Sequence, residues 1–215
     1  MTSNGNATGD FDSANTGISG SNRNVEPANG KLGIMLVGLG AVSTTFIAGV
    51  IDARRKKAKA IGSLTQMGTI RLGKRTENRS PLIKELVPLA ELDDIEFAAW
   101  DIFEDDALES ARHSGVLSKE HLDELADDLA AIKPMKAVFD RDYVKKLDGP
   151  NVKEARSKMA LAGMIVDDIQ EFKSSRNLDR IVIVWCASTE TFVEPSSVHD
   201  SISSFEAALE RNDPA

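Results

Sequence analysis

The 215-residue sequence has a single cysteine, Cys186, so the chain cannot form an internal disulfide. This scarcity favours a reducing, cytoplasmic setting. The sequence also lacks any run near the ~18 apolar residues that a membrane-spanning helix needs. Residues 1–30 lack the positively charged start and apolar core of a secretory signal. We therefore expect a cytoplasmic protein without a membrane partner.

Positive charge is also scarce, because 26 Lys and Arg residues stand against 34 Asp and Glu residues, for a formal net charge of -8. Nucleic-acid surfaces need clustered Lys and Arg, so this balance argues against a nucleic-acid partner. It leaves room for a small phosphate ligand, since N–H groups at the start of a helix bind phosphate whatever the global charge. The three histidines, His113, His121 and His199, lie far apart, which predicts surface residues and no metal site.

The pattern along the chain divides it into a tail and one domain. Residues 1–30 are rich in Ser, Asn, Gly, Thr and Ala, which predicts a disordered tail, and structure is expected over 31–215. Apolar runs typical of buried parallel strands lie at 32–37, 95–100 and 181–185. Helices are predicted over 43–59, 107–113, 119–132, 152–173 and 204–211, with a short helix over 81–89 and a strand or loop over 138–144. Strands that alternate with helices indicate an α/β fold with a mostly parallel sheet.

A glycine motif at residues 38–43 lies between the first strand and the first helix, where a dinucleotide fingerprint is found. Gly38 permits the tight turn, Gly40 lets the backbone approach a pyrophosphate, and Ser43 is small enough for helix–strand packing. The pyrophosphate would bind the N–H groups that open the helix. The alternative is an ordinary tight turn between a strand and a helix.

A dinucleotide site also calls for an acidic residue about 20 positions further on, at the end of the second strand, to hold the ribose hydroxyls. No acid lies near Ser63, where that spacing falls, and the next strand ends at Asp101. If residues 61–90 are an insertion, Asp101 is the ribose partner. Otherwise Asp101 caps the helix that follows, and the pattern alone leaves both interpretations open.

A third candidate site follows the last predicted strand, at residues 186–190. In open α/β sheets, ligands bind just beyond the carboxyl ends of the strands. Ser188 and Thr189 offer hydroxyl and N–H groups there. A nucleophilic Cys186 would need a neighbouring base, which the sequence does not indicate, so Cys186 is interpreted as a small buried residue.

With these segments in place, the sequence resembles the inositol-3-phosphate synthase family over about residues 32–215. The matching stretches are 36–40, 44–45, 48–51, 62–66, 69–71, 100–102, 168–173 and 184–190. The Gly-Ser-Leu-Thr-Gln stretch at 62–66 and the Trp-Asp-Ile stretch at 100–102 are specific to this family rather than to dinucleotide folds at large. The resemblance implies a Rossmann-like, doubly wound parallel sheet over 31–215 with NAD as its cofactor.

The resemblance also implies an enzyme that converts D-glucose 6-phosphate to 1D-myo-inositol 3-phosphate, a precursor for inositol and phospholipid biosynthesis. The family reaction combines an internal redox step with an intramolecular aldol closure, in a homotetramer. Carried over by position, the cofactor-binding residues are Gly38, Gly40, Ala41, Val42, Ser43, Asp101, Cys186, Ala187, Ser188 and Thr189. The match favours Asp101 as the ribose partner over a helix cap.

The sequence departs from the family pattern at several of these places. Cys186 and Ser188 stand where the family has Thr and Asn, and the glycine loop is one residue shorter than in eukaryotic members. Family members run to roughly twice this length, so we expect the catalytic lysines beyond Ala215, an incomplete sheet with an exposed edge, and no activity from the chain alone. The alternatives are a non-catalytic NAD-binding module that pairs with a full-length subunit, and a generic NAD-dependent dehydrogenase.

Overall fold

The computed structural model describes residues 29–188 and 190–214, so the predicted tail over 1–28 and the Thr189 site lie outside the described residues. The sheet contains β1 (Lys31–Val37), β2 (Ile95–Asp101), β3 (Met135–Lys136) and β4 (Leu178–Trp185). All pairings are parallel and the strand order is β3-β2-β1-β4. The predicted α/β fold is confirmed. Strand β4 is an outer strand, and its Trp185 side chain is 63% exposed.

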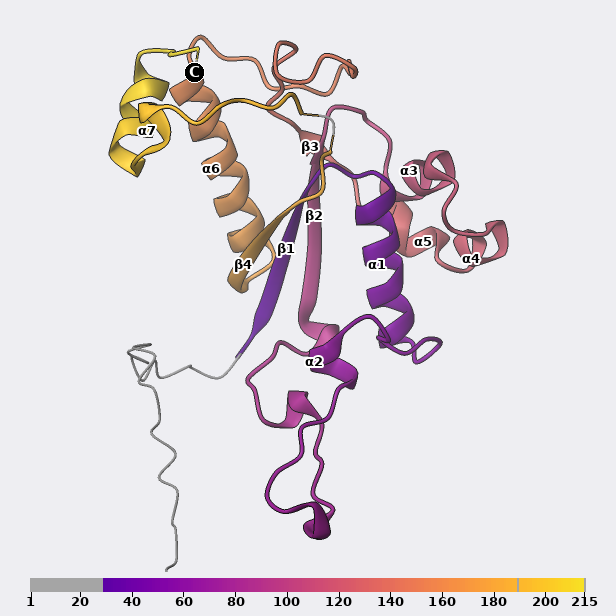
Figure 1. Cartoon of the computed structure of the whole chain (residues 1–215). Coiled ribbons are helices and arrows are strands. Elements are labelled where there is room, and N and C mark those ends of the chain that lie inside the picture. The colour runs from indigo at the N-terminus through magenta and orange to yellow at the C-terminus, as the bar shows by residue number, and fades with distance from the viewer. Residues whose placement is uncertain (1–28, 189, 215) are drawn as a thin grey trace, which may run out of the picture.

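Helices cover both faces of this sheet (Figure 1). One side carries α1 (Ala41–Arg54), α3 (Ala107–Ser114), α4 (Lys119–Glu124) and α5 (Ala126–Ala130), and the other carries α6 (Lys158–Ser175) and α7 (Ile202–Glu210). Successive residues of β1 point to opposite faces, so Leu36 packs in the core beneath α1 whereas Met35 packs against Phe172 of α6. Because both faces are buried, the strand has no charged or polar side chain after Lys31 and does not alternate, which confirms the doubly wound arrangement.

The chain between α1 and β2 forms a long excursion at the amino ends of the strands, at the bottom of Figure 1 and away from the glycine motif. Its elements are short: α2 (Leu64–Met67) and the 3₁₀ turns η1 (Arg75–Glu77), η2 (Ile83–Glu85) and η3 (Leu92–Asp94). Residues 61–90 thus contain no long helix or strand. The predicted helix over 81–89 is wrong beyond one 3₁₀ turn, since Pro88 has no N–H with which to continue it.

Three long predicted helices have different bounds in the structure. The helix predicted over 43–59 is observed over 41–54, because the chain turns at Lys56, which has a φ of +58°. The helix predicted over 119–132 is divided at Leu125, where the Glu124 carbonyl accepts a hydrogen bond from Arg55 (3.0 Å). The helix predicted over 152–173 begins only at Lys158, because the preceding chain is extended and its Lys153 N–H donates to the Ala137 carbonyl (2.8 Å). The segment 138–144 is a loop, and a last 3₁₀ turn, η4 (Ser197–His199), precedes α7.

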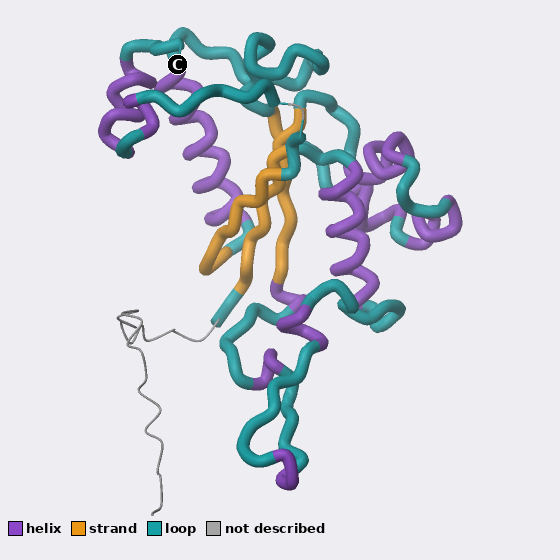
Figure 2. Tube along the Cα trace, in the orientation of Figure 1, coloured by secondary structure: helices purple, strands orange, loops and turns teal. Residues whose placement is uncertain are grey.

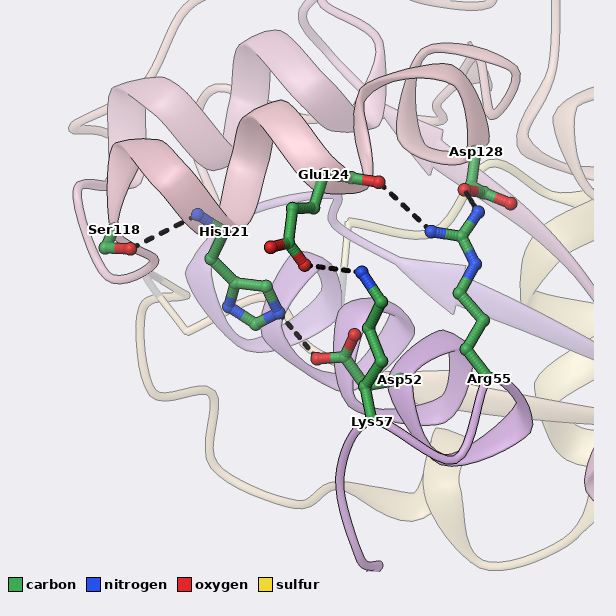
Figure 3. A network of polar contacts seen from close by, with 7 residues as sticks. All are labelled: Asp52, Arg55, Lys57, Ser118, His121, Glu124 and Asp128. Carbon is green, nitrogen blue, oxygen red and sulfur yellow. Dashed lines mark hydrogen bonds and ion pairs between the residues drawn. The ribbon is translucent and has the colours of Figure 1, made fainter.

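One predicted surface histidine is instead half-buried. The Nε2 of His121 lies 2.5 Å from the carboxylate of Asp52, whose side chain is only 9% exposed (Figure 3). The prediction of a surface position is therefore wrong for His121, because the sequence does not show that α4 packs its histidine onto the end of α1. His113 and His199 are exposed, as predicted.

Two ion pairs beside this contact also join the end of α1 to α4 and α5 (Figure 3). The Lys57 ammonium lies 2.5 Å from the Glu124 carboxylate, and Arg55 pairs with Asp128. The hydrogen bond from Lys57, and then its charge, lowers the pKa of Glu124 from the ordinary value of 4.5. Two acidic residues of α4 and α5, Glu124 and Asp128, are thus paired with cations at the end of α1 rather than only solvated.

Candidate cofactor site

The loops that follow β1, β2 and β4 meet at the carboxyl edge of the sheet, at the top of Figure 2. Gly38 lies between the other two loops: its N–H donates to the Trp100 carbonyl (2.9 Å), and a Cβ at Gly38 would lie 3.3 Å from the Ala187 nitrogen. Its φ of +93° is in the region that favours glycine. The structure therefore brings the glycine motif together with the two other segments that the sequence singles out.

Helix α1 begins directly after Gly40 with its first turn open. It has no side-chain cap and no acidic residue in that turn, so none of its own side chains occupies the first-turn amides. A Cβ at Gly40 would meet no atom within 4 Å, and Ala41 and Val42 are exposed. The amides of this turn thus border open space, and the arrangement can bind an anionic group such as a phosphate.

Ser43 is turned inward rather than toward that space. It is fully buried, and its Oγ donates to the Gly38 carbonyl (2.5 Å). Thr44 is buried beside it, and its Oγ1 donates to the Gly40 carbonyl (3.0 Å). These two bonds fasten the first turn of α1 to the glycine turn. Ser43 therefore has the small-residue packing position that the motif predicts, and its backbone amide is the group it retains for a ligand.

Asp101 ends β2 beside the glycine turn. Its Oδ2 accepts from the Leu39 N–H (2.5 Å) and its Oδ1 from the Phe103 N–H (3.0 Å). Each carboxylate oxygen retains further acceptor capacity, so a ribose hydroxyl can still bind. The alternative role as a helix cap is wrong, because the cap of α3 is Asp106, whose side chain accepts from the Leu108 N–H (3.0 Å).

The segment after β4 adds the third part of the edge. The Cys186 N–H donates to the Val37 carbonyl (2.9 Å), which extends the pairing of β4 with β1. The Cys186 side chain is half-buried and packs against the apolar core under α1, in line with its interpretation as a small buried residue. Ala187 lies against Gly38, and Ser188 is exposed.

Two polar residues near the end of β2, Asn151 and Asp168, have no role that the sequence predicts. Asn151 is buried, and its Nδ2 donates to the carbonyl of Asp101 (2.9 Å). Asp168 of α6 accepts from the indole N–H of Trp100 (2.6 Å) and pairs with Lys153 (2.8 Å). The one signal for Asp168 is its spacing, since a residue three after Ile165 and four before Phe172 lies on the apolar face of the helix.

The described part of the chain holds no cluster of three or more His, Cys, Asp or Glu side chains suited to a metal ion. Within those same residues, no helix has the length and apolar character to cross a membrane.

Comparisons with known proteins agree with one another. Residues 32–215 match an NAD-binding domain family described as myo-inositol-1-phosphate synthase. Inositol-3-phosphate synthase 1 of Bacteroides thetaiotaomicron is 42% identical over 87% of this chain and 43% of its own length. Inositol-3-phosphate synthase 1 of Oryza sativa subsp. japonica is 30% identical over 86% of this chain and 39% of its own length. The chain thus spans about two fifths of the length of these curated relatives.

A solved structure supports the fold. Inositol-3-phosphate synthase from Caenorhabditis elegans superposes with a TM-score of 0.77 at 22% sequence identity, over 87% of this chain and 40% of that one. The matched family domain is NAD-binding, which identifies NAD as the cofactor. The residues present fit a dinucleotide, because the open first turn of α1, the free space at Gly40 and the Asp101 carboxylate lie at one edge of the sheet.

Proposed function

Because the chain belongs to the myo-inositol-1-phosphate synthase family, we propose that it forms the NAD-binding part of an enzyme that converts D-glucose 6-phosphate to 1D-myo-inositol 3-phosphate. The observation that carries the proposal is the uncapped start of α1 beside Gly40, with Asp101 bonded to the same loop. An open helix start suits a diphosphate, and a carboxylate at the end of the second strand suits a ribose.

Each residue of the edge has a distinct role in this proposal. The amides of Ala41, Val42 and Ser43 bind the diphosphate, and Gly40 leaves the space that lets it approach. Asp101 accepts hydrogen bonds from the ribose hydroxyls while the Leu39 N–H holds its carboxylate in place. The segment of Cys186, Ala187 and Ser188 borders the site from β4, and the proposed contact from Thr189 lies outside the described residues.

The bound NAD supplies a hydride acceptor and later returns the hydride, so the conversion involves no net redox change. In this proposal, the chain's own residues bind the nucleotide and orient it along the carboxyl edge of the sheet. Since the chain spans about two fifths of its curated relatives, we propose that the sugar-phosphate chemistry requires residues outside it and that this chain alone has no synthase turnover. We also propose a cytoplasmic location and, for the complete enzyme, a homotetramer.

The site can be tested with Gly40→Ala, because alanine fits the local backbone: Gly40 has a φ of -89°. The added methyl group would enter the space assigned to the diphosphate without touching the protein. We expect NAD affinity, measured by isothermal titration calorimetry, to fall by about tenfold, which corresponds to about 1.4 kcal/mol. The unfolding midpoint should stay the same.

The matched control is Gly49→Ala on the same helix, where an added Cβ also meets no atom within 4 Å. It should leave NAD affinity unchanged. If Gly40→Ala binds NAD as tightly as the Gly49→Ala control, the cofactor does not lie against this helix start.

A further inference from the structure

We propose that Asp168 is a positioning residue for the Asp101 carboxylate, and through it for the ribose of NAD. The proposal rests on the proposed function, in which Asp101 holds the ribose hydroxyls. It is carried by a chain of contacts from Lys153 through Asp168 to Trp100, the residue immediately before Asp101.

The contacts of Asp168 are short and largely shielded from solvent. Its Oδ2 accepts from the indole N–H of Trp100 at 2.6 Å and lies 2.8 Å from the Lys153 ammonium, which also lies 3.0 Å from Oδ1. The side chains of Lys153 and Asp168 are 8% and 16% exposed, and Trp100 is 3% exposed. Hydrogen bonds to a charged group are strong and directional at such burial, so they define one position for the indole.

Trp100 is connected to both the glycine turn and Asp101 at the cofactor edge. Its carbonyl accepts the Gly38 N–H (2.9 Å), and the next residue is Asp101. A shift of the Trp100 backbone would therefore displace the ribose carboxylate of Asp101 and also disturb the glycine turn. Asp168 thus connects α6, on the far face of the sheet, to the loop that opens α1.

Stability alone is a weak explanation for this buried pair. Removing two charges from water is costly, and apolar residues of similar size often serve a core as well as or better than a buried ion pair. The apolar contacts of Ile165, Ile169 and Phe172 already pack α6 against the sheet. What a carboxylate adds at position 168 is a pair of oxygens that accept from the Trp100 indole and hold the Lys153 ammonium at the same time. Neither an apolar side chain nor asparagine, which has one acceptor oxygen and a donor NH2 group, could do both.

The test is a double-mutant cycle on NAD affinity, measured by calorimetry with the full chain. Asp101→Ala should weaken NAD binding by about tenfold, the size expected for a lost hydrogen bond to a charged group. Asp168→Asn should weaken it by about threefold to tenfold. In the Asp101→Ala background, Asp168→Asn should have a clearly smaller effect, because the carboxylate it positions is absent and only the glycine turn remains to be disturbed.

Matched controls separate positioning from general damage. Asp167→Asn changes the exposed neighbour on α6 and should leave NAD affinity unchanged. Trp100→Phe removes the indole N–H while it keeps an aromatic ring, and it should weaken NAD as Asp168→Asn does. Trp185→Phe removes the other indole, which bonds Glu190 at the surface, and should be neutral. Trp100 is then the single tryptophan of the chain, and its fluorescence should change when Asp168→Asn is added to Trp185→Phe.

The outcomes are distinct. If Asp101→Ala leaves NAD affinity intact, the ribose role in the proposed function fails, and this proposal fails with it. If Asp101→Ala weakens binding but Asp168→Asn and Trp100→Phe do not, the proposed function stands and the positioning role is overturned. Equal losses in both backgrounds would overturn the proposal, because Asp168 would then act on NAD affinity without the Asp101 carboxylate. Should Asp168→Asn fail to fold, Trp100→Phe in the same cycle decides.

Discussion

The charged groups that join α6 to the sheet are largely buried, whereas those that join α4 and α5 to α1 are more exposed, apart from Asp52. Lys153 and Asp168 are 8% and 16% exposed, but Lys57 and Glu124 are 47% and 55% exposed. The same residue types therefore act under different conditions: a buried pair must satisfy every charge, and an exposed pair competes with water and salt. Only the buried network lies next to the cofactor edge, through Trp100.

The distance between two charged groups therefore does not determine how much the pair stabilises the fold. The Lys57–Glu124 pair, at 2.5 Å, is shorter than the Lys153–Asp168 pair, at 2.8 Å, yet solvent screens the first far more. We expect the buried network to respond strongly to the loss of one partner and the exposed pairs to respond weakly. The Asp52–His121 contact should respond to an intermediate degree, because Asp52 is buried and His121 is partly exposed.

The largest effect is expected for Lys153→Met, which leaves the Asp168 carboxylate buried without its cation. We expect the free energy of unfolding to fall by about 3 kcal/mol, measured by urea denaturation. Lys173→Met, at an exposed position on α6, is the control and should change stability little. If Lys153→Met and Lys173→Met lowered the free energy of unfolding equally, burial of the Lys153–Asp168 pair would not be the cause of the loss.

An intermediate effect is expected for His121→Ala. Asp52 is buried and its Oδ1 already has no hydrogen-bond partner, so the loss of His121 would strip the contact from Oδ2 as well. We expect the free energy of unfolding to fall by about 2 kcal/mol, within the range for an unsatisfied buried group. His113→Ala removes a histidine that is 69% exposed beside Asp105 and should be close to neutral in the same thermal or urea experiment.

The smallest effect is expected for Glu124→Gln, and it should appear as a change in pH dependence. Lys57 lowers the pKa of Glu124 in the folded state, so this carboxylate stabilises the fold above its ordinary pKa of 4.5. That contribution is lost as the pH falls from 4.5 through the lowered folded value.

Urea denaturation at several pH values should therefore show a shallower acid dependence for Glu124→Gln than for wild type. Glu120→Gln, an exposed position on the same helix, should keep the wild-type slope. Added salt should reduce the difference, because the pair is exposed. An unchanged slope for Glu124→Gln would mean that Lys57 and the neighbouring Arg55 and His121 do not act on this carboxylate.

Local pattern predicted the element types better than their bounds. The apolar runs of β1 and β2 and the glycine turn were readable because each depends on neighbours in sequence. The break at Leu125 was not, since Leu122, Leu125 and Leu129 follow an unbroken helical spacing and all three are buried. The Glu124 carbonyl at that break bonds Arg55, which is 69 residues away.

The candidate site divides in the same way. The sequence indicated Gly38 and Gly40 as the turn, and the resemblance indicated Asp101, but Asp106 as the cap of α3 appeared only in the structure. Asp168 had no role predicted from the sequence. Its inward direction is visible only because Trp100 and Lys153 contact it from other elements.

By itself, the sequence determined the alternating strands and helices and the glycine turn, because steric limits and hydrophobic spacing act within a few residues. The tertiary structure alone decided which acidic groups serve which role. Asp101 meets Leu39 across 62 residues, Asp168 meets Trp100 across 68, and Asp52 meets His121 across 69. Such contacts depend on how the layers pack, and no local pattern encodes that packing.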